Sequence, residues 1–535
     1  MHSLSWCRIP GTSALVCDYV SGNQWLEALF AGEQQRRPCN PHAIVAIEAT
    51  MAGLALSAEQ RTSIEELRVG KPVVISGQQV GHFGGPLYTW LKVASLIVLA
   101  RQHGAVPVFW VEDNDHDIAE AQRIGIITPN DETVMLDCPT DGDSPEQTIV
   151  ATCRVGEMIS EQLTFLRSTF DRMPWGSSAV EILSQCYQAG RLWSDAFIEL
   201  HHRVWSRYGV VFVRSSVLRT IGAMGAILER DLRSPGDLAE AIVKQTDELV
   251  ARGYSAQLHA ADVNVFFHTD GRRFRIHRDT NDSYRFADRR ISHGELLDTL
   301  HREPERFSPS AALRPLVQDA LFAPTVTVLG PAELQYHAQL RSAYQRWNIP
   351  KATLYLRCSG TIVPSRVMRV LDRHTENVDV FVQPNHTFDR WLSEQFDNMQ
   401  VIERAVEAEQ TIRSILDHIE HYIGQFDPTL VRTVRATSHA ISSRMQRLEH
   451  KVRRAVLHLH QQQAQRYRGA RVHLFPNGGL QERSIAPIHW VCSLGIAYWG
   501  EVLLSLAQRA NCTHYIATPD ELLGVPGTPV VTKYV

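Results

Sequence analysis

Residues 72–86 read Pro-Val-Val-Ile-Ser-Gly-Gln-Gln-Val-Gly-His-Phe-Gly-Gly-Pro. The run Val73–Ser76 predicts a buried strand, and the glycines after it predict a tight loop before a helix that opens at Pro86. The free N–H groups and the positive dipole end of such a helix start bind anions readily. The loop matches neither common phosphate-binding motif, so it predicts either an anion-binding loop or a plain strand-to-helix turn.

A second strand, Pro107–Val111, follows that helix. Strand, helix and strand form a βαβ unit, which implies a parallel sheet. Both strands then end at the same edge, where open α/β sheets bind ligands. We therefore expect the glycine loop to lie beside the segment Glu112-Asp-Asn-Asp-His-Asp117.

This acid-rich segment contains candidate catalytic residues. His116 is the candidate general base or polar anchor, and Asp115 and Asp117 either orient it or hold a divalent cation. The alternative is a solvated acidic turn in which Asp117 caps a helix from Ile118. The 24 histidines form no recognised metal-binding spacing, so no protein-bound metal is predicted.

The rest of the chain predicts an α/β core over residues 1–387 with two inserted segments. One, at about 140–208, is helical, and the other, at about 255–305, contains a β-hairpin at Asp270-Gly271. Thr325–Leu329 followed by Gly330-Pro331 repeats the strand, glycine, proline and helix pattern of the opening stretch. Residues 467–535 are expected to pack back on the core.

Residues 388–466 carry apolar side chains at a mainly four-and-three spacing, which is typical of coiled coils. Two long helices joined at Gly424–Pro428 would form an antiparallel hairpin. A hairpin of this length cannot bury its apolar seam against a compact domain, so we expect it to project and to form a homodimer.

The totals favour an ordinary globular protein. Its 535 residues are 44% hydrophobic and 21% charged, with a net charge of -4 that argues against nucleic acid as the main partner. Nine scattered cysteines without a C-x-x-C pair favour a reducing compartment. Apolar runs stay short of the roughly 18 residues of a membrane span, and no signal-peptide pattern begins the chain. We expect a cytoplasmic protein with no membrane contact.

Other polar residues lie at predicted sheet edges. Gln78 and Gln79 either bind polar substrate groups or bond their own loop. Lys92, one of only six lysines, either faces the loop or is an ordinary surface residue. Arg314, Gln318 and Glu333 lie near a second edge, where ion pairing within the core is the alternative.

Several motifs in register resemble the bacillithiol-synthesis cysteine ligase family, from about residue 72 to about residue 500. They are Gly77-Gln-Gln-Val-Gly81 with Gly85-Pro-Leu-Tyr88 and Lys92, Pro107-Val-Phe-Trp with Asp115-His-Asp117, Arg314-Pro-x-x-Gln318, Gly330-Pro-x-Glu333 with Tyr336, and Pro476-Asn-Gly-x-Leu-Gln-Glu-Arg483. One departure is Asn114, which stands where the family usually has glutamate. A neutral amide cannot act as a base.

The resemblance implies a Rossmann-like parallel-sheet core with inserted connecting segments, a long antiparallel coiled coil and a dimer. It also implies nucleotide binding and the addition of L-cysteine to glucosaminyl-malate. Such an amide forms only after the carboxyl is activated, normally by ATP, so ATP or ADP and a divalent cation are the expected cofactors.

We then expect the loop with Gln79 and Lys92 to bind an anion, and His116 with Asp115 and Asp117 to orient substrate and move a proton. The full set of expected binding residues is Gly77, Gln78, Gln79, Gly81, Lys92, Arg314, Gln318, Gly330, Glu333, Tyr336, Asn477, Gln481 and Arg483. Three alternatives stay open: a ligase or nucleotidyl transferase acting on another amine, a non-catalytic nucleotide-binding protein, and a coiled-coil scaffold.

Overall fold

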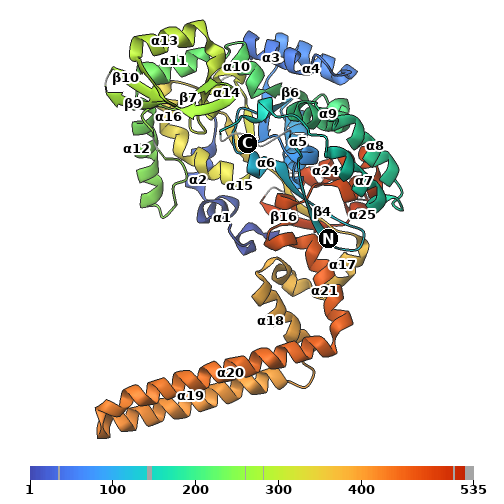
Figure 1. Cartoon of the computed structure of the whole chain (residues 1–535), viewed down its shortest axis with the longest axis vertical. Helices are drawn as coiled ribbons and strands as arrows, with labels where there is room; N and C mark the ends of the chain where they lie inside the picture. The colour runs from blue at the N-terminus through green and yellow to red at the C-terminus, as the bar shows by residue number, and fades with distance from the viewer. Residues whose placement is uncertain (34–36, 141–146, 260, 281, 510–511, 525–535) are drawn as a thin grey trace. The chain divides into compact units, whose positions relative to one another are not determined.

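The computed structural model describes residues 1–33, 37–140, 147–259, 261–280, 282–509 and 512–524. At its centre lies a parallel five-stranded sheet in the order β14-β13-β2-β3-β6 (Figure 1). Its strands are β2 (Val73–Gln79), β3 (Val106–Glu112), β6 (Val211–Arg214), β13 (Val326–Leu329) and β14 (Thr353–Leu356). The chain runs outward from β2 through β3 to β6, and then returns to β13 on the other side of β2. This reversal defines a doubly wound, Rossmann-like sheet with its switch point between β2 and β13, which confirms the predicted α/β class.

Helix α5 (Leu87–Gln102) connects β2 to β3 and is buried along almost its whole length. It packs against β2, β3 and β13, and α24 (Ile496–Ala507) packs against it in turn. Cover on several sides explains why α5 lacks the polar face of a surface helix. The predicted helix start was one residue early, because Pro86 has extended backbone angles and serves as the N-cap.

Two segments are inserted into the sheet connections. Between β3 and β6, β4 (Arg123–Ile127) and β5 (Thr133–Asp137) pair antiparallel in a hairpin that is separate from the central sheet. The rest of this insertion is helical, with α6 (Ile118–Gln122), α7 (Ile159–Phe170), α8 (Gly176–Cys186) and α9 (Trp193–Trp205).

The second insertion, between β6 and β13, holds two small antiparallel sheets. The predicted hairpin is present as β7 (Val265–Thr269) and β8 (Arg272–Arg275), with β12 (Phe307–Pro309) beside β7. Asp270 and Gly271 both have positive φ, as a two-residue hairpin turn requires. The other elements are α10 (Ser215–Thr220), α11 (Gly225–Arg233), α12 (Asp237–Ala251), β9 (His277–Thr280), β10 (Ser283–Phe286), β11 (Arg289–Ser292) and α13 (His293–Arg302).

The two ends of the described chain meet in one further sheet. Strand β16 (Thr513–Ala517) pairs antiparallel with β1 (His2–Ser5) and parallel with β15 (Ser359–Ile362). Outside residues 366–478, the remaining α-helices are α1 (Ala14–Val20), α2 (Gln24–Phe30), α3 (Pro41–Met51), α4 (Ala58–Arg68), α14 (Arg314–Phe322), α15 (Pro331–His337), α16 (Arg341–Trp347), α22 (Gln481–Ser484), α23 (Ile488–Leu494) and α25 (Pro519–Leu523).

No single helix among the described residues is long and apolar enough to cross a membrane. Helices α23 and α24 pass that test only as a pair, and they are bent by 113°.

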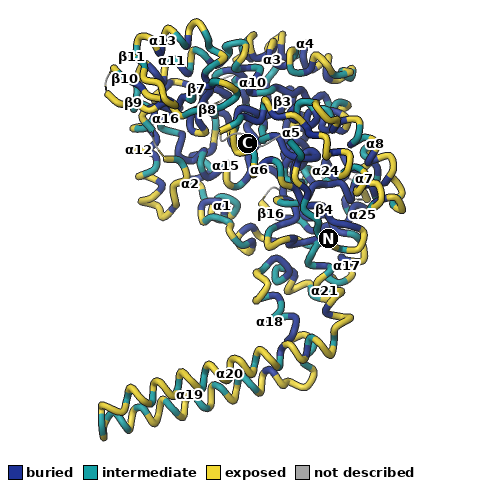
Figure 2. Tube along the Cα trace, in the orientation of Figure 1, coloured by how far each residue is buried: buried dark blue, intermediate teal, exposed yellow. Residues whose placement is uncertain are grey.

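The chain divides into two compact units, of which Arg366–Gly478 is the second. Beginning with α17 (Ser365–Leu371), its helices are α18 (Asn385–Phe396), α19 (Val401–Phe426), α20 (Val431–Leu459) and α21 (Gln461–Leu474). Helices α19 and α20 pack along each other on either side of a short turn, which confirms the coiled-coil hairpin (Figure 1). The second long helix ends earlier than predicted, because the backbone of His460 leaves helical geometry between α20 and α21. Figure 2 shows exposed and intermediate positions alternating along both helices.

Candidate active site

The switch point between β2 and β13 is occupied by a buried lysine. The Lys92 ammonium donates to the Gly77 carbonyl at 2.8 Å and to Gln78 Oε1 at 2.7 Å, and it pairs with Glu333 at 2.5 Å. Its three N–H groups therefore all have protein acceptors. Burial lowers the pKa of Lys92, and the Glu333 carboxylate opposes that shift. Lys92 is thus neither a surface residue nor a free anion ligand in this conformation.

Glu333 reaches this point because α15 begins directly after β13. Its carboxylate also accepts the Gly330 N–H at 2.7 Å, which closes the first turn of the helix. Of the residues predicted from separate motifs, the switch point therefore brings together five: Gly77, Gln78, Lys92, Gly330 and Glu333.

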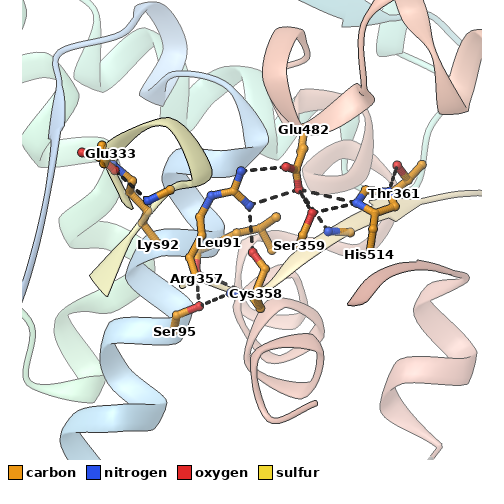
Figure 3. A network of polar contacts seen from close by, with 12 residues as sticks. Leu91, Lys92, Ser95, Glu333, Arg357, Cys358, Ser359, Thr361, Glu482 and His514 are labelled. Atoms are coloured by element: carbon orange, nitrogen blue, oxygen red, sulfur yellow. Dashed lines mark hydrogen bonds and ion pairs between the residues drawn. The ribbon is translucent and has the colours of Figure 1, made fainter. Parts of the chain in front are cut away.

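Beside Lys92 lies a buried ion pair that the sequence analysis missed (Figure 3). Arg357 follows β14 and holds the Glu482 carboxylate with two N–H groups, at 2.6 and 3.1 Å. The same carboxylate accepts bonds from Ser359 Oγ at 2.8 Å and from the Gly360 N–H at 3.0 Å. Ser359 also bonds His514 at 2.7 Å. Local sequence does not show these contacts, because Glu482 and its partners are more than 120 positions apart in the chain.

The environment of this network fixes the protonation states of Glu482 and His514 at pH 7. Burial raises the pKa of Glu482, but Arg357 outweighs burial and lowers it to about 2. Burial lowers the pKa of His514 to about 4, so the imidazole is neutral at pH 7. Ser359 and His514 are completely buried, which gives them a structural role as a connection between α22, β15 and β16.

At the end of β3, Asp113 and Asn114 serve the fold. Asp113 accepts bonds from the Ser216 N–H at 2.8 Å and from both neighbouring serine hydroxyls, so it caps α10. Asn114 accepts a bond from Arg219 Nε at 2.8 Å, while its buried Nδ2 has no protein partner. The amide at this position therefore binds an arginine.

Asp115 lies where the glycine-loop strand meets the inserted hairpin. Its carboxylate accepts bonds from Gln79 and from the His116 N–H, and Arg273 of β8 lies 3.6 Å away. Burial alone raises the pKa of Asp115, but Arg273 and these N–H donors together lower it. The His116 ring is 39% exposed, with Nδ1 at 3.6 Å from Asp115. Asp117 is exposed at the start of α6.

Glu112 is a second carboxyl group of this edge that the sequence analysis did not single out. It accepts bonds from Trp110 Nε1 at 3.0 Å and from Ser215 Oγ at 2.8 Å. Burial raises its pKa, although the positive charge of Arg314 opposes the shift. The edge therefore carries one carboxyl group with a raised pKa and one with a lowered pKa.

Arg314 is a cation of this site that has no carboxylate partner among the described residues. Its guanidinium donates to the Tyr336 hydroxyl at 2.9 Å, and no carboxylate of the described residues lies within ion-pair distance. Burial lowers the pKa of Arg314, but Tyr336, Glu112 and Glu333 reverse that effect and raise it. Part of the residue remains accessible to solvent. Gln318, one helical turn further on, is buried and bonds Asp319 and Thr327, so it belongs to the core.

The loop after β2 offers an anion fewer donors than predicted. The N–H groups of Gly84, Gly85 and Leu87 bond the Tyr187 hydroxyl, the His82 carbonyl and the Ile485 carbonyl, each at 2.9 Å. The start of α5 is thus covered by the chain itself. Gly81 is needed for close packing, since a Cβ there would lie 2.6 Å from the Gly85 Cα.

Of the three predicted binding residues near the C-terminus, one is bonded within the protein and two are exposed. Gln481 is buried, and its amide bonds the Ile362 N–H at 3.0 Å and the Ile362 carbonyl at 2.8 Å, which makes it structural. Arg483 is exposed. Asn477 is exposed in the unit Arg366–Gly478. Within the described residues, no group of three or more His, Cys, Asp or Glu side chains could hold a metal ion.

Fold and site together define a Rossmann-like α/β protein with charged groups at the carboxyl edge of its sheet. The chain belongs to the bacillithiol biosynthesis BshC family. Residues 4–358 match the N-terminal Rossmann-like domain of that family, and residues 360–518 match its C-terminal coiled-coil domain.

Relatives named "Putative cysteine ligase BshC" align along most of the chain. The protein from Chlorobaculum tepidum is 28% identical over 488 residues, which cover 86% of this chain and 85% of the relative. The protein from Salinibacter ruber is 29% identical over 502 residues, covering 89% and 91%. The protein from Staphylococcus haemolyticus is 25% identical over 470 residues, covering 84% and 85%.

Replacement of Glu482 by Gln should lower the free energy of unfolding by roughly 3–5 kcal/mol, because it leaves the Arg357 charge buried without a counter-ion. The pKa of Glu482 is lowered, so its contribution is complete above the unfolded carboxyl pKa of about 4.3 and disappears as the pH falls through about 2. Urea unfolding of both proteins between pH 7 and pH 3 measures this difference, which should narrow at the acid end.

The matched control is Glu65→Gln, which breaks the exposed pair with Arg68. This change should cost at most about 1 kcal/mol at any pH. Equal effects of the two substitutions would contradict the role given to the buried pair.

Proposed function

We propose that this chain is a ligase that joins the carboxyl group of L-cysteine to the amine of glucosaminyl-malate in bacillithiol biosynthesis, forming a carbon–nitrogen amide bond. Membership of the BshC family and the name of its relatives support the ligase class. The acceptor and the bond type rest on the family resemblance and on the chemistry available at the sheet edge.

The observation that carries the proposal is the polar cluster at the end of β3, where Asp115 lies beside the partly exposed His116 ring with Nδ1 at 3.6 Å. Burial raises the pKa of Glu112, whereas Arg273 and N–H donors outweigh burial and lower the pKa of Asp115. Environments that shift the pKa values of two neighbouring acids in opposite directions are typical of sites that both hold a charge and move a proton. An amine nucleophile needs both, since it arrives as a cation and must lose a proton to attack.

In the proposed reaction, the ionised Asp115 attracts the ammonium group of the acceptor. The partly exposed His116 ring beside it takes the proton that the amine must lose. The backbone N–H of His116 donates to the Asp115 carboxylate at 2.7 Å, and the ring Nδ1 lies 3.6 Å from the same carboxylate. Glu112 stays behind them and fixes the end of β3 through Trp110 and Ser215.

The proposed co-substrate is ATP, which supplies the phosphoryl or nucleotidyl group that activates a carboxylate. The residue that fits its anionic part is Arg314, whose guanidinium bonds only the Tyr336 hydroxyl among the described residues and remains partly accessible. Lys92 contributes indirectly, since it fixes the position of Gln78 and Glu333 around the same point. A divalent cation would arrive with the phosphates, because the carboxylates of this edge are bonded to protein donors.

We also propose a homodimer formed through the coiled-coil hairpin. The predicted apolar stripe on α19 divides into two faces. Ile412 is partly covered, whereas Ile415, Ile419, Tyr422 and Phe426 remain 54%, 40%, 67% and 88% exposed. Their spacing of four, three and four residues is that of a coiled-coil seam. Such an apolar stripe on a helical hairpin fits a second copy of the same hairpin.

Purified protein should form cysteinyl-glucosaminyl-malate only when ATP and cysteine are both present, and His116→Ala should lower its kcat by about a hundredfold or more through loss of the proton acceptor. Mass spectrometry of the product and circular dichroism of both proteins check activity and fold. His42→Ala, which removes an exposed histidine of α3, is the control and should be fully active. Wild-type protein that is active on a different amine would replace the proposed acceptor.

Arg314→Met should raise the KM for ATP at least tenfold, because one charge-assisted contact to phosphate is lost. Arg314→Lys keeps the charge and should recover part of the affinity. Steady-state kinetics with ATP varied at saturating cysteine give the KM for ATP of both variants. An unchanged KM in the methionine variant would remove Arg314 from the nucleotide site.

Ile415→Glu should shift the protein from dimer to monomer in analytical ultracentrifugation at micromolar concentration, because it places a charge in the apolar seam. The control is Val250→Glu on α12, which alters a side chain of similar exposure, 56%, outside the hairpin. A wild-type protein that sediments only as a monomer would disprove the proposed dimer.

A further inference from the structure

The glycine loop after β2 has an unusual backbone. Phe83 has φ 47° and ψ 42°, and Gly84 and Gly85 follow with φ of 82° and 76°. Three consecutive residues thus have positive φ. For a bulky aromatic residue this conformation is strained, and it persists only when surrounding contacts enforce it.

Two polar side chains of the helical insertion supply such contacts. The Tyr187 hydroxyl, at the end of α8, accepts the Gly84 N–H at 2.9 Å and donates to the Gly81 carbonyl at 3.4 Å. The His201 Nε2, on α9, lies 2.9 Å from the Gly84 carbonyl. Tyr187 therefore bridges the two ends of the loop turn, and His201 completes the bonding of Gly84.

The protonation of His201 suits this role. Burial lowers its pKa to about 4, so the ring is neutral at pH 7. A carbonyl accepts, so Nε2 must carry the proton, while Nδ1 has no hydrogen-bond partner among the described residues. The ring packs against Trp90 and Phe197 in tilted arrangements, with centroids at 4.2 and 4.5 Å, and these contacts restrict its rotation.

The side chains around the loop leave it little room to move. The Phe83 ring lies 5.0 Å from the Tyr187 ring, and a Cβ added to Gly84 would lie 2.6 Å from Trp90. Tyr187 and His201 are both completely buried, so water cannot replace their bonds. Loss of either bond would leave a buried backbone group of the loop unsatisfied.

We propose that Tyr187 and His201 are positioning residues that hold the glycine loop in its positive-φ conformation and thereby set the end of β2 at the reaction site. This inference rests on the proposed ligase function. The end of β2 carries Gln78, bonded to Lys92, and Gln79, bonded to Asp115. A loop that relaxes moves both glutamines, although neither positioning residue touches the sheet edge.

The test is Tyr187→Phe, which removes only the hydroxyl. The kcat should fall by roughly ten- to a hundredfold, the scale of a displaced reactive group, while the KM for ATP changes much less. Hydrogen exchange at the amides of residues 81–88 should become faster in the same variant. Both readouts are specific to the loop, whereas a purely structural role would lower only the melting temperature.

Tyr284→Phe is the matched control, because the Tyr284 hydroxyl is equally buried and has no hydrogen-bond partner. This change should alter neither kcat nor the exchange of the loop. For the second residue, His201→Gln retains a donor and should preserve activity better than His201→Phe, which retains only the ring shape.

Two failures are distinguishable. Wild-type protein without ligase activity would overturn the proposed function, while the exchange measurement would still show whether Tyr187 and His201 hold the loop. An active wild type whose Tyr187→Phe variant has unchanged kcat and unchanged exchange at residues 81–88 would overturn the positioning role.

Discussion

The buried ammonium group of Lys92 is the constraint on which the centre of this protein depends. A lysine inside the apolar helix α5 is tolerated only if each of its N–H groups has an acceptor. The Gly77 carbonyl, Gln78 and Glu333 meet that condition. Since these acceptors come from β2 and α15, the same charge that must be neutralised also connects the two sides of the topological switch point.

A second buried pair, Arg357 with Glu482, extends this arrangement to the far end of the chain. It attaches α22 to the segment that follows β14, and Gln481 adds two bonds to the backbone of Ile362. Most of the polar side chains described at this edge are therefore bonded to other groups of the protein, and few remain for a ligand. Arg314, Asp115 and His116 are the partly exposed groups on which the proposed chemistry depends.

Much of the architecture could be predicted from local sequence. The βαβ unit, the hairpin at Asp270-Gly271 and the coiled coil were all confirmed, because strand periodicity, turn residues and heptad spacing act over few residues. For the site, motifs located the switch-point residues but not what they bind. Lys92, Gln79 and Gln481 were expected to contact ligands, and each is bonded to the protein. Glu112 and Glu482 lie inside two of these motifs but were not singled out, and Arg357 lies in none of them.

The sequence by itself therefore determined the fold class, the family and the positions of the polar motifs, since these follow from patterns along the chain. Only the tertiary structure decided which polar groups are satisfied within the protein and which remain for a ligand. That distinction depends on partners that are distant in the chain, such as Ile485 for the Leu87 N–H and Glu482 for Arg357. Each of these pairs is separated by more than a hundred residues. A hydrogen bond is short-ranged in space, and distance along the chain does not limit it.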